Sequence, residues 1–153
     1  MKSLFTFCLL IFNSAHAGEY SLLEQRSWKK IVPKLIICSN SVSKTIVEDA
    51  VKFWRNKGYH LKDPVLKKEC KKDIEIDTIK FIEQLDNSKI ARNQNGITDR
   101  RFDGRLMFGA NITVKSVYRD QSQLIRHEIG HALGLEHSDN PDHVMYTYRK
   151  YNI

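Results

Sequence analysis

The chain has 153 residues, enough for one domain but hardly for two. Hydrophobic residues make up 41% of the chain and charged residues 28%, a balance that excludes a largely disordered protein. The net charge of +7 is compatible with acidic partners, but a basic face that keeps the protein in solution is the simpler explanation.

The N-terminal segment has the pattern of a secretory signal peptide. One lysine precedes an apolar run from Leu4 to Phe12, and an Ala-x-Ala sequence ends at Ala17. We therefore predict a signal peptide over residues 1–17, cleavage after Ala17, and a single mature domain over 18–153 that is secreted or periplasmic. The run is too short to anchor the mature chain in a membrane. The alternative is a buried N-terminal helix.

Cleavage there removes Cys8 and leaves two cysteines, Cys38 and Cys70. Two cysteines in an exported protein favour one disulfide. Two free thiols are the alternative, because the sequence does not place their Cα atoms within bridging range. Four lysines flank Cys70 with no aromatic side chain among them, so we expect no nucleic-acid partner.

The first half of the mature chain predicts a strand, a helix and a loop. The β-branched and apolar segment Ile31–Cys38 is typical of a strand. A helix is predicted from Thr45 to Gly58, with Thr45 and Glu48 at the spacing of a capping box and Trp54 on the apolar face, in the core. Residues 59–77 are rich in lysine and predict a loop.

The second half predicts two strands and a second helix. Thr78–Gln84 alternates like a strand, residues 86–104 are predicted to be a long connection, and a strand follows over 105–114. In that last strand one face is predicted to consist of Leu106, Phe108, Ala110, Ile112 and Val114.

The second helix is predicted to begin after Asp120, as its N-cap, and to end near Gly134. Strand, helix, two strands and helix, followed by an irregular tail, predict the α+β class with a small twisted sheet and two main helices. Nothing in the pattern requires a second subunit, and we expect a monomer.

Three residues of the second helix carry a candidate metal site. Four residues turn an α-helix by roughly 400°, so His127 and His131 lie one turn apart on nearly the same face. Their imidazoles can therefore bind one zinc ion, and the neighbouring Glu128 can reach a water beside it. Ordinary capping or core histidines are the alternative, which leaves Glu128 unexplained.

His137 is the candidate third ligand, and Gly134 permits the turn that brings it to the metal. A glycine permits the left-handed turn that ends a helix, and the chain can then return to bring His137 to the metal. Three neutral imidazoles with one open position are typical of a catalytic zinc site, whereas four protein ligands are typical of a structural one.

These residues, in the pattern H-E-x-x-H-x-x-G-x-x-H, resemble the metzincin signature. "HALGLEHS" followed by "NPDHVMY" is similar to the matrixin branch, the relatives of the matrix metalloproteases. The resemblance implies a zincin-like fold with a mostly parallel sheet and a short C-terminal Met-turn subdomain. It also implies that Met145 forms an apolar floor beneath the metal.

Other features limit the ions and ligands we expect. No histidine lies between Leu61 and Arg126, so we expect one catalytic Zn²⁺ and no second, structural zinc site. Calcium is a further candidate ion, through Asp99, Asp103 and Gly104. His143 is expected to be a surface turn residue, since the three-histidine set is complete without it.

The sequence thus predicts an exported zinc endopeptidase that acts on protein or peptide substrates. A zinc-activated water would attack the peptide bond, with Glu128 as general base. The strand over 105–114 is either an edge that could pair with an extended peptide or an inner strand of the sheet. The alternatives are a basic zinc-binding module without catalysis and a zinc hydrolase of non-peptide amides.

Overall fold

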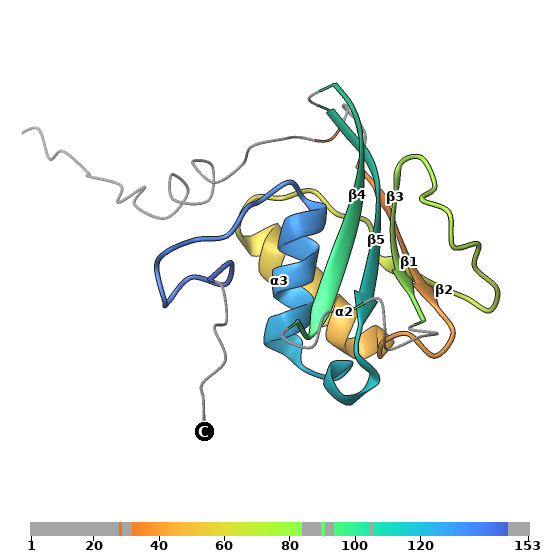
Figure 1. The fold of residues 1–153 in the computed structure, drawn as a ribbon, viewed down its shortest axis with the longest axis horizontal. Coiled ribbons are helices and arrows are strands. Elements are labelled where there is room, and N and C mark those ends of the chain that lie inside the picture. The colour runs from red at the N-terminus through yellow and green to blue at the C-terminus, as the bar shows by residue number, and fades with distance from the viewer. Residues whose placement is uncertain (1–27, 29–31, 84–89, 91–93, 105, 147–153) are drawn as a thin grey trace, which may run out of the picture.

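The fold is built on one five-stranded sheet. The computed structural model describes residues 28, 32–83, 90, 94–104 and 106–146, and there the strand order is β2-β1-β3-β5-β4 (Figure 1). The first three pairings in this order are parallel, and only the edge strand β4 runs antiparallel to its neighbour β5. The strands are β1 (Lys34–Cys38), β2 (Pro64–Lys67), β3 (Thr78–Ile82), β4 (Gly96–Asp103) and β5 (Leu106–Val114).

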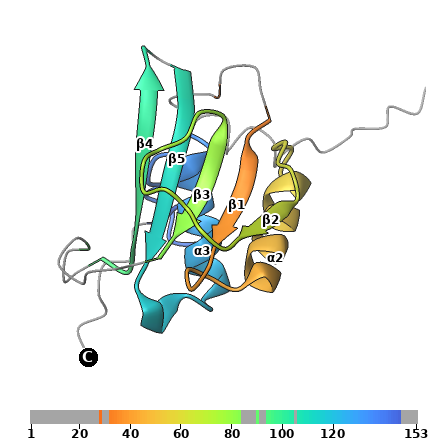
Figure 2. The same ribbon diagram turned by 90° about the vertical axis from the view of Figure 1, so that its right-hand side faces the viewer.

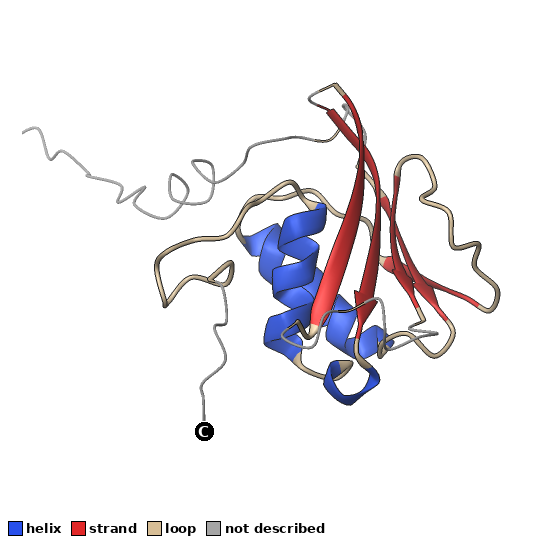
Figure 3. Ribbon diagram, in the orientation of Figure 1, coloured by secondary structure: helices blue, strands red, loops and turns tan. Residues whose placement is uncertain are grey.

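Two helices, α2 (Lys44–Asn56) and α3 (Ser122–Ala132), cover the same face of this sheet (Figures 2 and 3). A short 3₁₀ turn, η1 (Ser116–Tyr118), precedes α3. The predicted α+β class, with a mostly parallel sheet and two main helices, is confirmed. Neither helix of the described part has the length and apolar character needed to cross a bilayer.

The core lies between the helices and the sheet. The strand register aligns Leu35 with Ile79, and Ile79 with Ala110, so apolar side chains form a continuous row across the inner face. Trp54 of α2 is fully buried, and its indole N–H donates to the backbone carbonyl of Arg126 at 2.8 Å. The predicted core position of Trp54 is confirmed, and the bond fixes α2 against α3.

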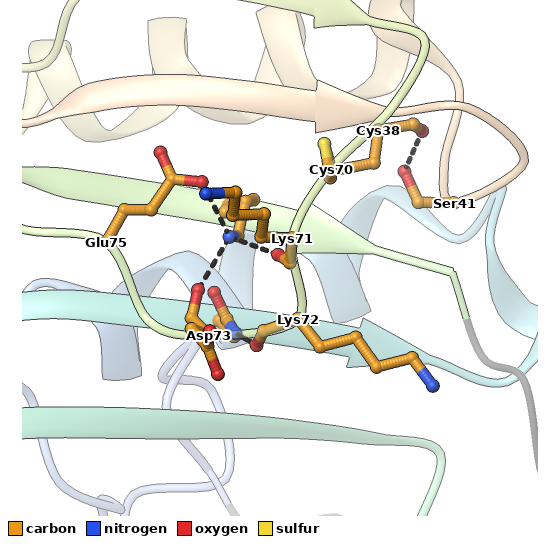
Figure 4. The surroundings of a disulfide bond; sticks show 9 residues. Cys38, Ser41, Cys70, Lys71, Lys72, Asp73 and Glu75 are labelled. Atoms are coloured by element: carbon orange, nitrogen blue, oxygen red, sulfur yellow. Dashed lines mark hydrogen bonds and ion pairs between the residues drawn. A yellow bond between two sulfur atoms is a disulfide. The ribbon is translucent and has the colours of Figure 1, made fainter.

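The segment after β2 is held on the other face of the sheet. Cys38 at the end of β1 and Cys70 form a disulfide, 32 residues apart in sequence (Figure 4). Lys80 of β3 is completely buried, and its ammonium donates to the carbonyls of Lys71 and Asp73 at 2.5 and 2.7 Å. It also pairs with Glu75 at 3.1 Å, and this hydrogen bond lowers the pKa of the Glu75 carboxyl.

Two strands were not predicted. β2 lies in the predicted loop over 59–77, and β4 lies in the predicted connection over 86–104. Both are edge strands: three of the four β2 residues are exposed, and β4 has no fully buried residue. Neither has the alternation of apolar and polar residues by which a half-buried strand is recognised in a sequence.

The predicted apolar face of β5 is correct only in its second half. Ala110, Ile112 and Val114 lie in the core, but Leu106 is 38% exposed and Met107 is fully buried instead. The register with β4 shifts opposite Phe108, and a bulge of this kind reverses which side chains face inward.

The predicted N-caps are wrong, whereas Gly58 and Gly134 follow the helix ends with the expected positive φ. α2 begins at Lys44 with Ser43 as N-cap, so Thr45 lies inside the first turn and forms no capping box with Glu48. α3 begins at Ser122 with Gln121 as N-cap, one residue after the predicted Asp120. Neither N-cap side chain bonds to its helix; instead the Gln121 carbonyl accepts from the Ile125 N–H.

Several predicted boundaries lie outside the described residues. These are the signal peptide over 1–17 with its cleavage after Ala17, the strand start at Ile31, the strand end at Gln84 and the first residue, 105, of the next strand. Within the described residues the first strand begins at Lys34, after Pro33, and the third ends at Ile82.

Candidate metal centre

Three histidines converge at the C-terminal end of α3. His127 and His131 lie one turn apart on the helix, and His137 follows it in the chain. One nitrogen of each ring lies within 4.8 Å of one nitrogen of each of the others. His127 is buried, His131 is half-buried and His137 is exposed, so the group opens to solvent on the His137 side.

The turn at Gly134 brings the third histidine back. Gly134 has a φ of 102°, in the left-handed region that side chains disfavour. The N–H of Leu135 donates to the carbonyl of Gly130 at 3.0 Å and closes the helix. Nε2 of His137 then lies 3.1 Å from Nε2 of His131. The structure therefore places Gly134 and His137 as the sequence predicted.

Backbone carbonyls orient two of the rings. Nδ1 of His127 lies 2.8 Å from the carbonyl of Val144, and Nδ1 of His131 lies 2.8 Å from the carbonyl of Leu135. A carbonyl only accepts, so each Nδ1 carries the proton and each Nε2 presents a lone pair. This arrangement is typical of histidines that bind metal, because the second bond fixes the tautomer and the ring plane.

The electrostatics also favour neutral rings. Burial lowers the pKa of His127, and burial together with the charge of His127 lowers the pKa of His131 to about 3. At neutral pH both rings are uncharged, which is the form that binds a metal ion. Nitrogens about 2.0–2.1 Å from a tetrahedral zinc lie roughly 3.3 Å apart, close to the 3.1 Å between His131 and His137. The three residues therefore fit zinc.

Glu128 is a buried carboxylate beside these rings. Its exposed fraction is 4%, and the hydroxyl of Thr98 on β4 donates to its Oε2 at 2.6 Å. Burial raises the pKa of Glu128 to about 7, while the Thr98 bond acts in the opposite direction. A cation held by the imidazoles would favour the ionised form. Thr98 was missed in the sequence because β4 was not recognised as a strand.

Gly96, also on β4, leaves room for the same carboxylate. A Cβ atom at this position would lie 2.6 Å from Oε1 of Glu128, so no side chain fits without a shift. The edge strand therefore approaches the Glu128 carboxylate at two positions: Thr98 donates a hydrogen bond to it, and Gly96 has no side chain that would collide with it.

Met145 lies in the chain that returns after the histidines. It is fully buried, and its sulfur is the atom that a Cβ at Gly130 of α3 would strike first. The N–H of Ser138 donates to the Met145 carbonyl at 2.9 Å and ties the segment beside His137. Met145 thus packs against the helix turn between the two helical histidines.

The prediction for His143 is wrong. It is 5% exposed rather than on the surface, and its Nδ1 accepts the N–H of Met145 at 3.1 Å. The side chain turns inward because it caps the turn that positions Met145. The sequence carries no local signal for this, because the inward position depends on how the returning chain folds.

The candidate calcium residues do not converge. Asp99 and Asp103 are exposed on β4, four residues and therefore about 13 Å apart along the strand. Gly104 follows with a φ of 59°, typical of a turn glycine. Among the described residues only the three histidines form a group that could hold a metal ion.

Of the two alternatives for the strand over 105–114, the structure shows the inner strand. β5 is an inner strand, paired with β3 on one side and β4 on the other, so its hydrogen-bonding groups are already used. The edge on the side of Glu128 belongs to β4, which carries Gly96 and Thr98. β4 also packs against α3, as β5 does.

Comparison with known families gives one result. The family model described as matrixin matches residues 27–153, which covers the whole described structure. Comparisons with curated proteins and with solved structures gave no match.

Proposed function

The chain belongs to the matrixin family, and from this membership and the geometry of the site we propose that it is a zinc endopeptidase. The family supports a zinc metallopeptidase in general and implies the zincin-like fold. The observation that carries the proposal is the set of three ring nitrogens within 4.8 Å of one another, beside a buried carboxylate.

His127, His131 and His137 would hold a single zinc ion through their ring nitrogens. When bound, zinc lowers the pKa of a coordinated water to about 7 and polarises a carbonyl oxygen. Three protein ligands leave a position for water, and the exposed side of His137 gives access to it. Met145 would supply the apolar floor of the site, since it packs against the turn of α3 between the two helical ligands.

Glu128 is the proposed general base. Its carboxylate would take a proton from the attacking water while the water oxygen bonds to the peptide carbon. The same proton would then pass to the amide nitrogen as the C–N bond breaks, and the second proton of the water would leave the new carboxyl group for the amine, so the products are a carboxylate and an ammonium group. The buried position keeps the carboxylate poorly solvated and therefore basic.

The free edge of β4 is the proposed binding site for an extended peptide substrate. An edge strand has unpaired N–H and C=O groups that can pair with an added strand. β4 carries the two residues that contact Glu128, so a peptide on this edge would lie beside the proposed base. We propose a monomer that acts on protein or peptide substrates.

Export is a further part of the proposal. The apolar run and the Ala-x-Ala sequence before residue 18 support a cleaved signal peptide. The Cys38–Cys70 disulfide supports an oxidising compartment, because such bonds rarely persist in a reducing cytosol.

The test is digestion of a diverse peptide library by the zinc-loaded chain from residue 18, read by mass spectrometry. We expect internal cleavage that stops with a chelator, and none with Glu128→Gln, which should still bind one zinc. Cleavage by Glu128→Gln at the wild-type rate would exclude Glu128 as base. Activity on cell-wall fragments alone would indicate a hydrolase of non-peptide amides, and inactivity on both a non-catalytic zinc-binding module.

A further inference from the structure

The carboxylate of Glu128 is held by a residue outside the metal-binding motif. Thr98 and Glu128 are 30 residues apart in sequence and lie on different elements, β4 and α3. The Thr98 hydroxyl lies 2.6 Å from Oε2 of Glu128, at the short end of the range for O–H···O bonds and within the range of charge-assisted ones. We propose that Thr98 is the positioning residue of the general base, an inference that rests on the proposed peptidase function.

The hydroxyl has one proton and two acceptors within reach. The Glu128 backbone carbonyl lies 3.1 Å away and the carboxylate oxygen 2.6 Å away, so the proton goes to the carboxylate. Oε2 of Glu128 is thereby engaged as the acceptor of the Thr98 hydroxyl. No described residue donates to the other oxygen, Oε1, which leaves it as the oxygen that accepts the proton of the water.

Gly96 makes this division of the two oxygens possible. It lies two residues before Thr98 on the same strand, and any side chain there would meet Oε1 at 2.6 Å. Residues at this spacing share one face of a strand. One face of β4 therefore binds one oxygen of the carboxylate and keeps side chains away from the other.

A fixed carboxylate matters for the rate rather than for binding. A glutamate side chain has three rotatable bonds, and a base contributes only when it is within hydrogen-bond reach of the proton that it takes. Threonine is stiff at χ1, so its hydroxyl is a well-placed anchor. Loss of the hydroxyl should therefore lower kcat and leave KM nearly unchanged, since the Thr98 side chain contacts the base, whereas a peptide added to the β4 edge would pair with backbone groups.

The same threonine could instead serve only to tie β4 to α3. Valine has nearly the same shape without the hydroxyl, and serine keeps the hydroxyl without the methyl group. A purely structural role would make both variants less stable and equally impaired. A positioning role separates them, because only the variant that lacks the hydroxyl loses the carboxylate contact.

The activity test compares Thr98→Val and Thr98→Ser in the zinc-loaded protein, with peptides from the library digestion. Thr113→Val on the adjacent strand β5 is the matched control, since Thr113 is half-buried on the sheet as well. We expect Thr98→Val to lower kcat about tenfold or more. We expect Thr98→Ser to keep most of the activity, Thr113→Val to match the wild type, and all three to bind one zinc.

A second measurement does not depend on activity. In zinc-loaded protein with ¹³C-labelled glutamate carboxyl groups, the Glu128 resonance is the one that Glu128→Gln removes. We expect Thr98→Val to move it and Thr98→Ser and Thr113→Val to leave it in place. An unmoved resonance in Thr98→Val, or equal kcat values for Thr98→Val and wild type, would overturn the inference about Thr98 alone. A wild-type protein that cleaves no peptide would overturn the proposed function, while the resonance still reports on the contact.

Discussion

Arg100 of the edge strand β4 reaches the turn that carries the third histidine, with its Nη2 3.1 Å from Oε1 of Glu136. Burial is the main cause of the low pKa of His131, and the positive charge of Arg100 lowers this pKa further. A positive charge close enough to act on His131 also acts on a cation bound there. Glu136 therefore neutralises the charge of Arg100 beside the proposed zinc site.

Replacement of Glu136 by Gln should weaken zinc binding. The change leaves the Arg100 charge uncompensated beside a divalent cation, and a pair of this kind is worth about 0.2–1 kcal/mol, or up to roughly fivefold in Kd. The measurement is competition for zinc against a chromophoric chelator at neutral pH.

Arg100→Met is the matched control for this prediction. It removes the positive charge and leaves the Glu136 carboxylate, so the zinc affinity should be preserved or increased. The double variant Arg100→Met, Glu136→Gln should lie near the wild type. If Glu136→Gln and Arg100→Met lost zinc affinity equally, the pair would act by holding the turn in place and not by its charges.

Replacement of Gly130 by Ala should destabilise the protein although Ala favours helices. The added Cβ would meet the sulfur of Met145 and would lie 2.8 Å from the indole ring of Trp54, both completely buried. Overpacking of this kind costs about 1–3 kcal/mol, more than the roughly 1 kcal/mol gained in helix propensity. Urea unfolding of the metal-free protein measures the difference.

Gln123→Ala, at an exposed position of the same helix, provides the comparison. It should change the free energy of unfolding by less than about 0.5 kcal/mol, because nothing packs against that face. If Gly130→Ala were as stable as Gln123→Ala, Met145 would not be packed against α3 as the structure shows.

The three-histidine half of the candidate site could be predicted from the sequence because its geometry is local. Helical periodicity alone fixes His127, Glu128 and His131 relative to one another. Gly134 then predicts the turn that brings His137 back toward the other two histidines, and the structure has the expected left-handed backbone there. None of these relationships needs a contact between distant parts of the chain.

The other half could not be predicted because it depends on sheet pairing. Thr98 and Arg100 reach the site only when β4 pairs with β5, and β4 is polar and half-exposed along its length. An edge strand of this kind lacks the alternation that reveals a strand, and its register is set by the neighbour. The inward turn of His143 likewise depends on the fold of the returning chain and not on its own sequence.

Removal of the disulfide should destabilise the chain without affecting the metal site directly. Cys38 and Cys70 close a loop of 32 residues, and a loop of this length corresponds to about 3–4 kcal/mol of chain entropy. The double variant Cys38→Ser, Cys70→Ser should melt at a lower temperature by calorimetry and still bind one zinc at the wild-type affinity.

Lys80→Met gives an independent test of the same segment. It removes the only ammonium donor to the carbonyls of Lys71 and Asp73 within the described residues, while the disulfide stays intact. Faster amide exchange over 71–75 is the expected result. If the exchange rates in this segment matched the wild type, the buried lysine would not be what holds it.

The stability of the metal-free protein should depend on pH through groups of the site with opposite signs, since the pKa values of His127 and His131 are lowered and that of Glu128 is raised. His131, with a pKa of about 3 in the fold, takes up a proton on unfolding at any pH between there and its ordinary value of 6.5. Its contribution to stability is therefore present above pH 6.5 and is lost as the pH falls. Glu128, with a pKa of about 7 in the fold against an ordinary 4.5, releases a proton on unfolding between these values. Its contribution is present below pH 4.5 and is lost as the pH rises.

Two variants separate these contributions. One proton corresponds to about 1.4 kcal/mol per pH unit, so between roughly pH 5 and 6 Glu128→Gln should make the free energy of unfolding rise more steeply with pH by up to this amount. His131→Gln should make the slope shallower by a similar amount, because the proton taken up on unfolding is gone. Urea unfolding of chelator-treated protein across this range measures all three slopes. Parallel curves for the wild type and His131→Gln would show that His131 is not buried as a neutral ring in the metal-free fold. Its Nε2 would then lose its proton only when the metal binds.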